Sequence, residues 1–184
     1  MIAIMSHGFA SLFSDAPHTA CARGARLFRF DDPVTRMYLV EEGRIDLVRH
    51  TRSGAALTLS QYRAGEVVAE AAAYAMAYHC DGVAAGETHL RWLTVQGFLD
   101  RLDATPDAAR DWSRHLARSL QSARMSAEIR SLATVADRLD AWLGEAGEMP
   151  EKGRYQEVAA QIGVSREALY RELSRRRRGA TVPR

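Results

Sequence analysis

The stretch from Pro106 to Glu145 constrains the fold more than any other part of the chain. It has no proline after its first residue and no glycine before Gly144. Thr105, Pro106 and Asp107 make a favourable helix start. We expect a helix of about 27 residues from Asp107, roughly 40 Å long at about 1.5 Å per residue. A domain of this size cannot cover such a helix, so the helix needs a partner along its length.

Two stripes of apolar residues follow the helical period in this stretch. The first stripe has small residues and the spacing of a coiled-coil seam, and it consists of Ala109, Leu116, Leu120, Ala123 and Ala127. The second stripe is expected to pack on another domain, and it consists of Ile129, Leu132, Ala136, Leu139 and Leu143. The first stripe predicts a second copy of the chain as the cover, and hence a homodimer. The alternative is a helix folded onto its own domain.

The first third of the chain has the pattern of short strands instead. Runs of β-forming residues alternate with turn signals such as Asp31-Asp32-Pro33, at intervals of eleven or twelve residues. The expected strands lie within residues 25–30, 36–50 and 56–62, and a later pair with a turn near Gly86 lies within 82–95. This spacing is typical of an all-β barrel or roll.

Composition points to a cytoplasmic protein. No apolar run approaches the ~20 residues that span a bilayer. The N-terminal stretch MIAIMSHGFASLFSD lacks the basic start and the cleavage site of a signal peptide. Cys21 and Cys80 lie far apart and neither has a Cys-x-x-Cys partner, so we expect reduced thiols.

The charge is unevenly distributed although the whole chain carries only +2. Between Arg166 and Arg184 there are seven arginines against two glutamates, whereas the rest of the chain is slightly acidic. This end of the molecule is either built for a polyanion or is a solvated tail.

Residues 155–178, YQEVAAQIGVSREALYRELSRRRR, have the pattern of two helices joined by a sharp turn. Gly163 permits a positive φ at the turn, and Ser165 can cap the second helix. Ala159, four residues before the glycine, lets the helices approach closely. The buried faces are expected to be Val158 and Ile162 on the first helix and Leu169 and Leu173 on the second.

The second of these helices carries side chains suited to a DNA groove. Arginine can bind O6 and N7 of guanine through two hydrogen bonds, and glutamate can accept from cytosine N4. The arginine run, Arg175–Arg178, is expected to contact phosphates. We therefore assign double-stranded DNA binding to Ser165, Arg166, Glu167, Tyr170, Arg171, Arg175 and Arg176. A plain helical hairpin is the alternative.

These motifs together resemble the Crp/Fnr family of bacterial transcription regulators over nearly the whole chain. The resemblance rests on LFRFDDPVTRMYLVEEGRIDLV at 27–48, on Gly54 and Gly65-Glu66, and on SREALYR at 165–171. It implies an α+β fold in three parts. These are an N-terminal cyclic-nucleotide-binding-type β-roll at 1–104, a long dimerisation helix at 105–134, and a C-terminal helix-turn-helix at 135–184.

The resemblance also implies partners and contacts. It assigns base contacts to Arg166, Glu167 and Arg171, a two-fold DNA target with TGTGA-like half-sites, a homodimer, and RNA polymerase as a further partner. The family follows its recognition helix with a β-hairpin wing, but GATVPR alone follows the arginine run here. We expect the wing to be missing or truncated and the arginine run to replace its backbone contacts.

Residues 69–82, AEAAAYAMAYHCDG, form what we name the effector segment. The family uses this segment to hold the phosphate of a cyclic nucleotide. Alignment places Glu70 on the ribose-binding glutamate, Cys80 in place of the phosphate-binding arginine and Asp81 in place of the serine. Asp81 would repel a phosphate by a few kcal/mol, and no arginine lies between Arg63 and Arg91 to compensate. This argues against a cyclic nucleotide as effector.

Three interpretations of the effector segment remain. In the first, a helix from Ala71 to Tyr78 packs into the roll and leaves no site. In the second, a pocket at Glu70, His79, Cys80 and Asp81 takes another small molecule, such as one with a cationic group. In the third, the protein is a metal, haem or redox sensor. The ligands for Cu(I) or haem would come from Met76, His79, Cys80, Cys21 and His18.

No catalytic arrangement is visible in the sequence. It has no Gly-rich phosphate loop, and its six histidines are scattered, so we expect no enzyme. The rival function is an interaction protein of the same fold whose basic tail binds RNA or acidic proteins. Within the regulator class, activity without any ligand is a further alternative.

Overall fold

The computed structural model describes residues 10–50, 54 and 56–179, apart from the side chain of residue 179. The chain divides into two compact units, whose boundary lies between Ala117 and Arg118. This boundary falls inside the long helix α3, Pro106–Ser131. The first unit is the described part of the chain up to Ala117, and the second unit begins at Arg118. The three domain ranges expected from the sequence stay a prediction.

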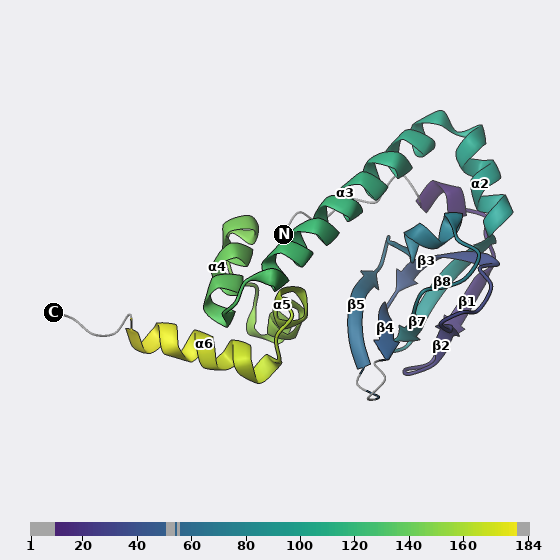
Figure 1. Cartoon of the computed structure of the whole chain (residues 1–184). Coiled ribbons are helices and arrows are strands. Elements are labelled where there is room, and N and C mark those ends of the chain that lie inside the picture. The colour runs from purple at the N-terminus through teal and green to yellow at the C-terminus, as the bar shows by residue number, and fades with distance from the viewer. Residues whose placement is uncertain (1–9, 51–53, 55, 180–184) are drawn as a thin grey trace. The chain divides into compact units, whose positions relative to one another are not determined.

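The first unit is built from two antiparallel four-stranded sheets (Figure 1). One sheet has the order β1-β8-β3-β6 and the other the order β2-β7-β4-β5. The strands are β1 His18–Cys21, β2 Arg26–Phe28, β3 Arg36–Glu42, β4 Arg44–His50, β5 Ala56–Arg63, β6 Val67–Val68, β7 Asp81–Ala84 and β8 Thr88–Thr94. Every segment expected to hold strands does hold them. The short strands β1 and β6 were not expected.

Strand β3 explains how the first unit fills its interior. Met37 and Leu39 point into one apolar cluster, which contains Phe98 and Trp112 from the helices. Tyr38 and Val40 point the other way, into the cluster between the sheets. Because successive side chains of a strand face opposite sides, a strand buried on both faces is a continuous apolar run, as here.

Helices cover the outer face of the sheet that contains β3. The 3-10 helix η1 spans Ser11–Phe13 and helix α2 spans Val95–Ala104, and both contribute to the same cluster as the start of α3. Thr94 caps α2 by accepting a hydrogen bond of 3.0 Å from the Gly97 amide. None of the helices in the described residues is both long and apolar enough to cross a lipid bilayer.

Helix α3 has 26 residues and begins one residue before the expected start. Trp112 is buried against the first unit and donates a hydrogen bond of 3.1 Å from Nε1 to the hydroxyl of Tyr74. Further along, Leu120 is 52% exposed, and Ala123 and Ala127 are exposed as well. The first apolar stripe of the sequence is therefore half-buried at its start and uncovered over its second half.

The second unit contains the end of α3 and the remaining helices. These are α4 Val135–Ala146, the 3-10 helix η3 Lys152–Arg154, α5 Tyr155–Ile162 and α6 Arg166–Gly179. Their apolar cluster is built around Ile129, Leu139, Val158, Ile162 and Leu169. The second apolar stripe thus supplies Ile129 from α3 and Leu139 from α4 to this core, and its last residue, Leu143, packs against it.

Candidate nucleic-acid interface and effector segment

The turn between α5 and α6 has the geometry expected from its residues. Gly163 has φ +68°, in the left-handed region, and ends α5. The Val164 amide donates to the Ala159 carbonyl at 2.9 Å, and Ser165 Oγ caps α6 by accepting from the Ala168 amide at 3.1 Å. Val158 and Ile162 on α5 and Leu169 on α6 are buried, and Leu173 packs against the same core. The predicted helix pair, turn and cap are confirmed.

Two arginines that sequence reasoning missed hold this turn. Arg130 on α3 donates from Nη2 to the Ala160 carbonyl at 3.0 Å and from Nε to the Gln161 carbonyl at 3.1 Å. Arg138 on α4 donates from Nη1 to the Gly163 carbonyl at 3.2 Å. The carbonyls at a helix end lack partners within the helix and carry partial negative charge, so guanidinium groups stabilise them. No local sequence pattern marks either arginine.

The first turns of α6 present polar side chains to solvent. Arg166, Glu167 and Arg171 are exposed, and the Arg166 guanidinium lies 5.3 Å from the centre of the Tyr170 ring. Hydrogen bonding with its own backbone amide, and then with Ser165, lowers the pKa of the Glu167 carboxyl. Glu167 is therefore a charged acceptor at neutral pH, suited to an amino group such as cytosine N4.

The arginine run is not uniform. Arg175 pairs with Glu172 at 2.8 Å, and Arg177 donates to Ser174 Oγ at 3.3 Å. Arg176 is turned toward α4, and Arg178 is exposed. The segment from Gly179 to Arg184, where the sequence suggests a missing wing, lies outside the described residues except for the backbone of Gly179.

Glu172 is a buried residue of α6 whose carboxylate pairs with Arg175 and Arg176. Hydrogen bonds from Arg175 and then from Arg176 lower its pKa to about 2, from an ordinary value of 4.5. A carboxyl whose pKa falls on folding stabilises the folded state above its unfolded pKa, and this stabilisation is lost as the pH falls toward the folded pKa.

We therefore expect Glu172→Gln to destabilise the second unit at pH 7, by about 1–2 kcal/mol, because charge-assisted hydrogen bonds are lost. The difference from the unsubstituted protein should shrink as the pH is lowered from 4.5 toward 2. Urea denaturation at a series of pH values measures it. A difference that stays constant over this range would show that the charge of Glu172 contributes nothing.

The effector segment departs from the expected helix over Ala71–Tyr78. A 3-10 helix, η2, spans Glu70–Tyr74 and then stops. Beyond it the chain is extended, because it pairs with the segment after β2: the Val34 amide donates to the Met76 carbonyl and the Tyr78 amide to the Asp32 carbonyl, both at 3.0 Å. The expected helix is wrong after Tyr74. Ala72, Ala73 and Tyr78 are nevertheless buried in the roll.

Two of the expected pocket residues, Glu70 and Asp81, have side-chain partners within the chain, and the backbone carbonyl of His79 has one as well. Glu70 accepts a hydrogen bond of 2.6 Å from the hydroxyl of Tyr62, and the His79 carbonyl accepts one of 2.6 Å from Arg49 Nη2. Burial, followed by the neighbouring Glu70 carboxylate, raises the pKa of Tyr62, so this hydroxyl stays a donor. The carboxylate expected to bind a ribose hydroxyl is thus engaged by the protein itself.

The surroundings of Asp81 differ from those expected, because its carboxylate has a compensating arginine. Its Oδ1 accepts from the Phe30 amide at 2.7 Å, while Arg26 Nε lies 3.4 Å and His50 Nδ1 lies 3.6 Å from its Oδ2. The prediction that Asp81 has no cation beside it is wrong. These partners are distant in sequence: β2 pairs with β7 near Arg26, and antiparallel pairing of β4 with β7 places Val48 opposite Asp81 and so brings His50 close.

The candidate metal ligands differ widely in their surroundings. Met76 is 92% exposed, whereas Cys80 is 6% exposed. Burial raises the pKa of both Cys21 and Cys80, so both are thiols rather than thiolates at neutral pH. His18 Nδ1 lies 2.8 Å from Glu41 Oε2. In the part of the chain that the structure describes, no three His, Cys, Asp or Glu residues form a group that could hold a metal ion.

We expect the purified protein to give an absorption spectrum without metal or haem bands, and the spectrum to be unchanged on titration with Cu(I) or haem. We also expect calorimetric titration with cAMP to show no saturable binding, because Glu70 is engaged by Tyr62 and Asp81 by the Phe30 amide and Arg26. A stoichiometric metal or haem would support the third interpretation of the effector segment. A saturable cAMP isotherm would contradict the argument against a cyclic nucleotide.

The comparisons with known proteins agree with this geometry. The family model of the cyclic nucleotide-binding domain matches residues 8–105, more than half of the chain. A crystal structure of the N-terminal domain of a transcriptional regulator from Streptomyces coelicolor is 28% identical, with a TM-score of 0.51; the match covers 65% of this chain and 83% of that one. No curated protein matches the chain.

Two further solved structures match nearly the whole chain, so the matches include both units. The c-di-GMP responsive global regulator CLP of Xanthomonas campestris is 20% identical, with a TM-score of 0.68, and the match covers 97% of this chain and 95% of that one. FixK2 of Bradyrhizobium japonicum is 15% identical, with a TM-score of 0.70, and the match covers 92% and 88%. The chain therefore belongs to the family of proteins with a cyclic nucleotide-binding domain, and it has the fold of the CRP/FNR transcription regulators.

Proposed function

We propose that this protein is a homodimeric transcription regulator that binds double-stranded DNA in a sequence-specific way. The observation that carries the proposal is the exposed start of α6, where Arg166, Glu167 and Arg171 project beyond a turn fixed by Gly163 and Ser165. A helix that presents such side chains at its N-terminal end can read base edges in the major groove.

The proposed contacts divide into two kinds. Arg166, Glu167 and Arg171 contact base edges in TGTGA-like half-sites, and Ser165 and Tyr170 support them. The phosphate contacts come from the exposed arginines of the run, Arg175, Arg177 and Arg178, and they add affinity without sequence information. RNA polymerase, the partner implied by the sequence resemblance, is the proposed protein partner.

The dimer is proposed to form along α3. Support comes from the uncovered half of its apolar stripe, Leu120, Ala123 and Ala127, which has the small-residue spacing of a coiled-coil seam and is open to a second copy. A two-fold dimer places two copies of α6 on two half-sites, which accounts for a two-fold DNA target.

We expect Leu120→Glu to convert the dimer to a monomer, because it places two like charges at the seam. DNA binding should fall with it, since each α6 would then act alone. Sedimentation velocity measures the mass, and the neighbouring exposed residue supplies the control, Gln121→Glu, which should remain dimeric. A monomeric unsubstituted protein, or a dimer of the Leu120 variant, would contradict this interface.

The effector segment is proposed to act without a cyclic nucleotide. The carboxylates of Glu70 and Asp81 already have partners in Tyr62, the Phe30 amide and Arg26, so the DNA-binding state does not need a phosphate beside them. A ligand could bias the protein only by binding one arrangement of the reading helices more tightly than another.

Fluorescence anisotropy distinguishes the proposed DNA-binding regulator from the alternative, an interaction protein whose basic tail binds RNA. We expect the protein to bind a random-sequence duplex of about 40 base pairs more tightly than single-stranded RNA of that length. The affinity should fall linearly with salt on a double-logarithmic scale. Tight binding to RNA with none to duplex DNA would favour the interaction-protein alternative.

A further inference from the structure

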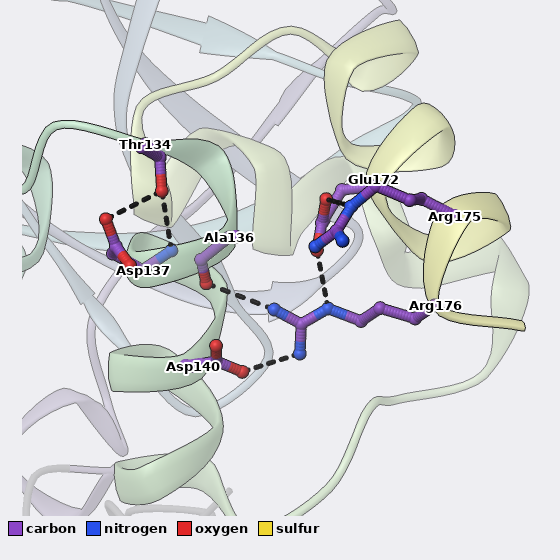
Figure 2. A network of polar contacts seen from close by, with 7 residues as sticks. All are labelled: Thr134, Ala136, Asp137, Asp140, Glu172, Arg175 and Arg176. Carbon is purple, nitrogen blue, oxygen red and sulfur yellow. Dashed lines mark hydrogen bonds and ion pairs between the residues drawn. The ribbon is translucent and has the colours of Figure 1, made fainter. Parts of the chain in front are cut away.

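Arg176 differs from its neighbours in the arginine run. Its side chain is 29% exposed, whereas that of Arg175 is 66% exposed. Each of its three guanidinium nitrogens donates to one acceptor of the protein: Nη1 to Asp140 Oδ1 at 2.6 Å, Nε to Glu172 Oε1 at 2.7 Å, and Nη2 to the Ala136 carbonyl at 3.1 Å (Figure 2).

The acceptors lie on two different helices, so Arg176 links α6 to α4. Glu172 is on α6 one turn before Arg176, while Ala136 and Asp140 are on α4 one turn apart. Figure 2 shows the guanidinium lying between the two helices. Two carboxylates hold one guanidinium, and such charge-assisted hydrogen bonds are short and strongly directional.

The α4 side of the link is itself fixed. Thr134 caps α4 by accepting from the Asp137 amide at 3.0 Å, and its hydroxyl donates to Asp137 Oδ2 at 2.7 Å (Figure 2). Leu139 on α4 is fully buried in the core that also holds Leu169 of α6. The Arg176 link therefore ties α6 to a rigid neighbour.

The link lies far along α6 from the N-terminal residues that are proposed to contact bases, and it therefore fixes the direction of the helix axis. Ten residues separate Arg166 from Arg176, about 15 Å at about 1.5 Å per residue. Leu169 and Leu173 pack the middle of the helix, and Arg176 holds its far end. A helix held at two separated points has a defined axis, so its N-terminal side chains meet the groove at one angle.

We propose that Arg176 is a positioning residue of the DNA-reading helix and does not contact a phosphate. This assignment rests on the proposed function. It replaces the phosphate contact expected from the sequence, because all three nitrogens of Arg176 are directed to acceptors on α4 and α6. Arg176 acts on base recognition through Asp140 and Glu172.

Asp140→Ala gives the sharpest test, because a pure charge effect and the positioning role predict opposite changes in DNA affinity. Removing an exposed negative charge should strengthen DNA binding if charge alone matters. If Asp140 instead holds Arg176, the change should weaken binding to the preferred duplex by about 5- to 30-fold, with little effect on a scrambled duplex. Binding to both duplexes is measured by anisotropy over a series of salt concentrations.

Arg176→Lys separates charge from geometry. Lysine keeps a phosphate contact but cannot reach three acceptors in a plane, so we expect it to reproduce the loss of specificity with an unchanged salt slope. The double variant with Asp140→Ala should bind no more weakly than either single variant, because the two residues act as one link. The matched control is Arg110→Lys, at an exposed arginine of the first unit that pairs with Asp107, and it should behave as the unsubstituted protein.

Three results decide the matter. Full specificity in Arg176→Lys, or unchanged or tighter specific binding in Asp140→Ala, would overturn the positioning role while leaving the proposed function intact. A lower salt slope in Arg176→Met, with equal loss on both duplexes, would return Arg176 to a phosphate contact. No sequence preference in the unsubstituted protein would overturn the proposed function and the positioning role together. Thermal unfolding of each variant shows that the reading unit is folded.

Discussion

Arg166→Ala is expected to weaken binding to the preferred DNA by about 5- to 150-fold, which corresponds to about 1–3 kcal/mol, and Arg171→Ala to do the same. Each side chain is exposed at the reading end of α6, and a guanidinium that binds one guanine through two hydrogen bonds has no substitute in alanine. The loss should be confined to particular base pairs. Anisotropy titrations against duplexes that carry single base changes measure it.

The matched control for these variants is Arg178→Ala, at an exposed arginine of the same helix. It should weaken binding to every duplex alike and lower the salt slope by about one for each arginine removed. If the variants at 166 and 178 showed the same sequence-independent loss, the assigned base contacts would be wrong.

Gly43→Ala is expected to destabilise the first unit by about 2–6 kcal/mol, the sum of backbone strain and steric overlap. Gly43 joins β3 to β4 with φ +88°, where side chains are strained. A Cβ there would lie 2.4 Å from the Glu87 carbonyl oxygen and 2.8 Å from Thr88 Cα. These are backbone atoms of the neighbouring turn, which cannot move aside without breaking the pairing of β8.

Gly24→Ala separates the two causes. Gly24 has a similar φ of +79°, but a Cβ there would meet nothing within 4 Å. We expect a loss of about 1–2 kcal/mol from strain alone. Hydrogen exchange of the β3 and β8 amides reports on the first unit by itself. Equal losses in the two variants would mean that crowding at Gly43 contributes nothing.

The parts of the molecule that could be predicted are those whose determinants are local. The α5–α6 turn needs a positive φ, a small residue and a cap, and Gly163, Ala159 and Ser165 supply them within seven residues of sequence. The long helix was predictable for the same reason, since its start lies at Pro106 and nothing interrupts its period before Ser131.

The parts that could not be predicted depend on long-range pairing. Asp81 is compensated by Arg26 and lies beside His50, which are 55 and 31 positions earlier and reach it through β2 and β4. The effector segment turns extended after Tyr74 because it pairs with residues around Asp32 and Val34. Neither pairing leaves a local signal.

The arginines of the second unit show the same limit in a charged sequence. Arg130, Arg138 and Arg176 donate to acceptors at helix ends and on a neighbouring helix, whereas Arg166 and Arg171 project from the exposed start of α6. Residue type and position along the chain do not separate these roles. The distinction comes from which acceptors the fold brings within reach.

Selection of bound fragments from a random pool of duplex DNA tests the central claim most directly. We predict enrichment of a two-fold motif with half-sites about one helical turn apart, as two copies of α6 require. Enrichment should be lost in the Arg166→Ala and Arg171→Ala double variant. A pool that stays random after repeated rounds, although the protein binds it, would contradict a sequence-specific regulator.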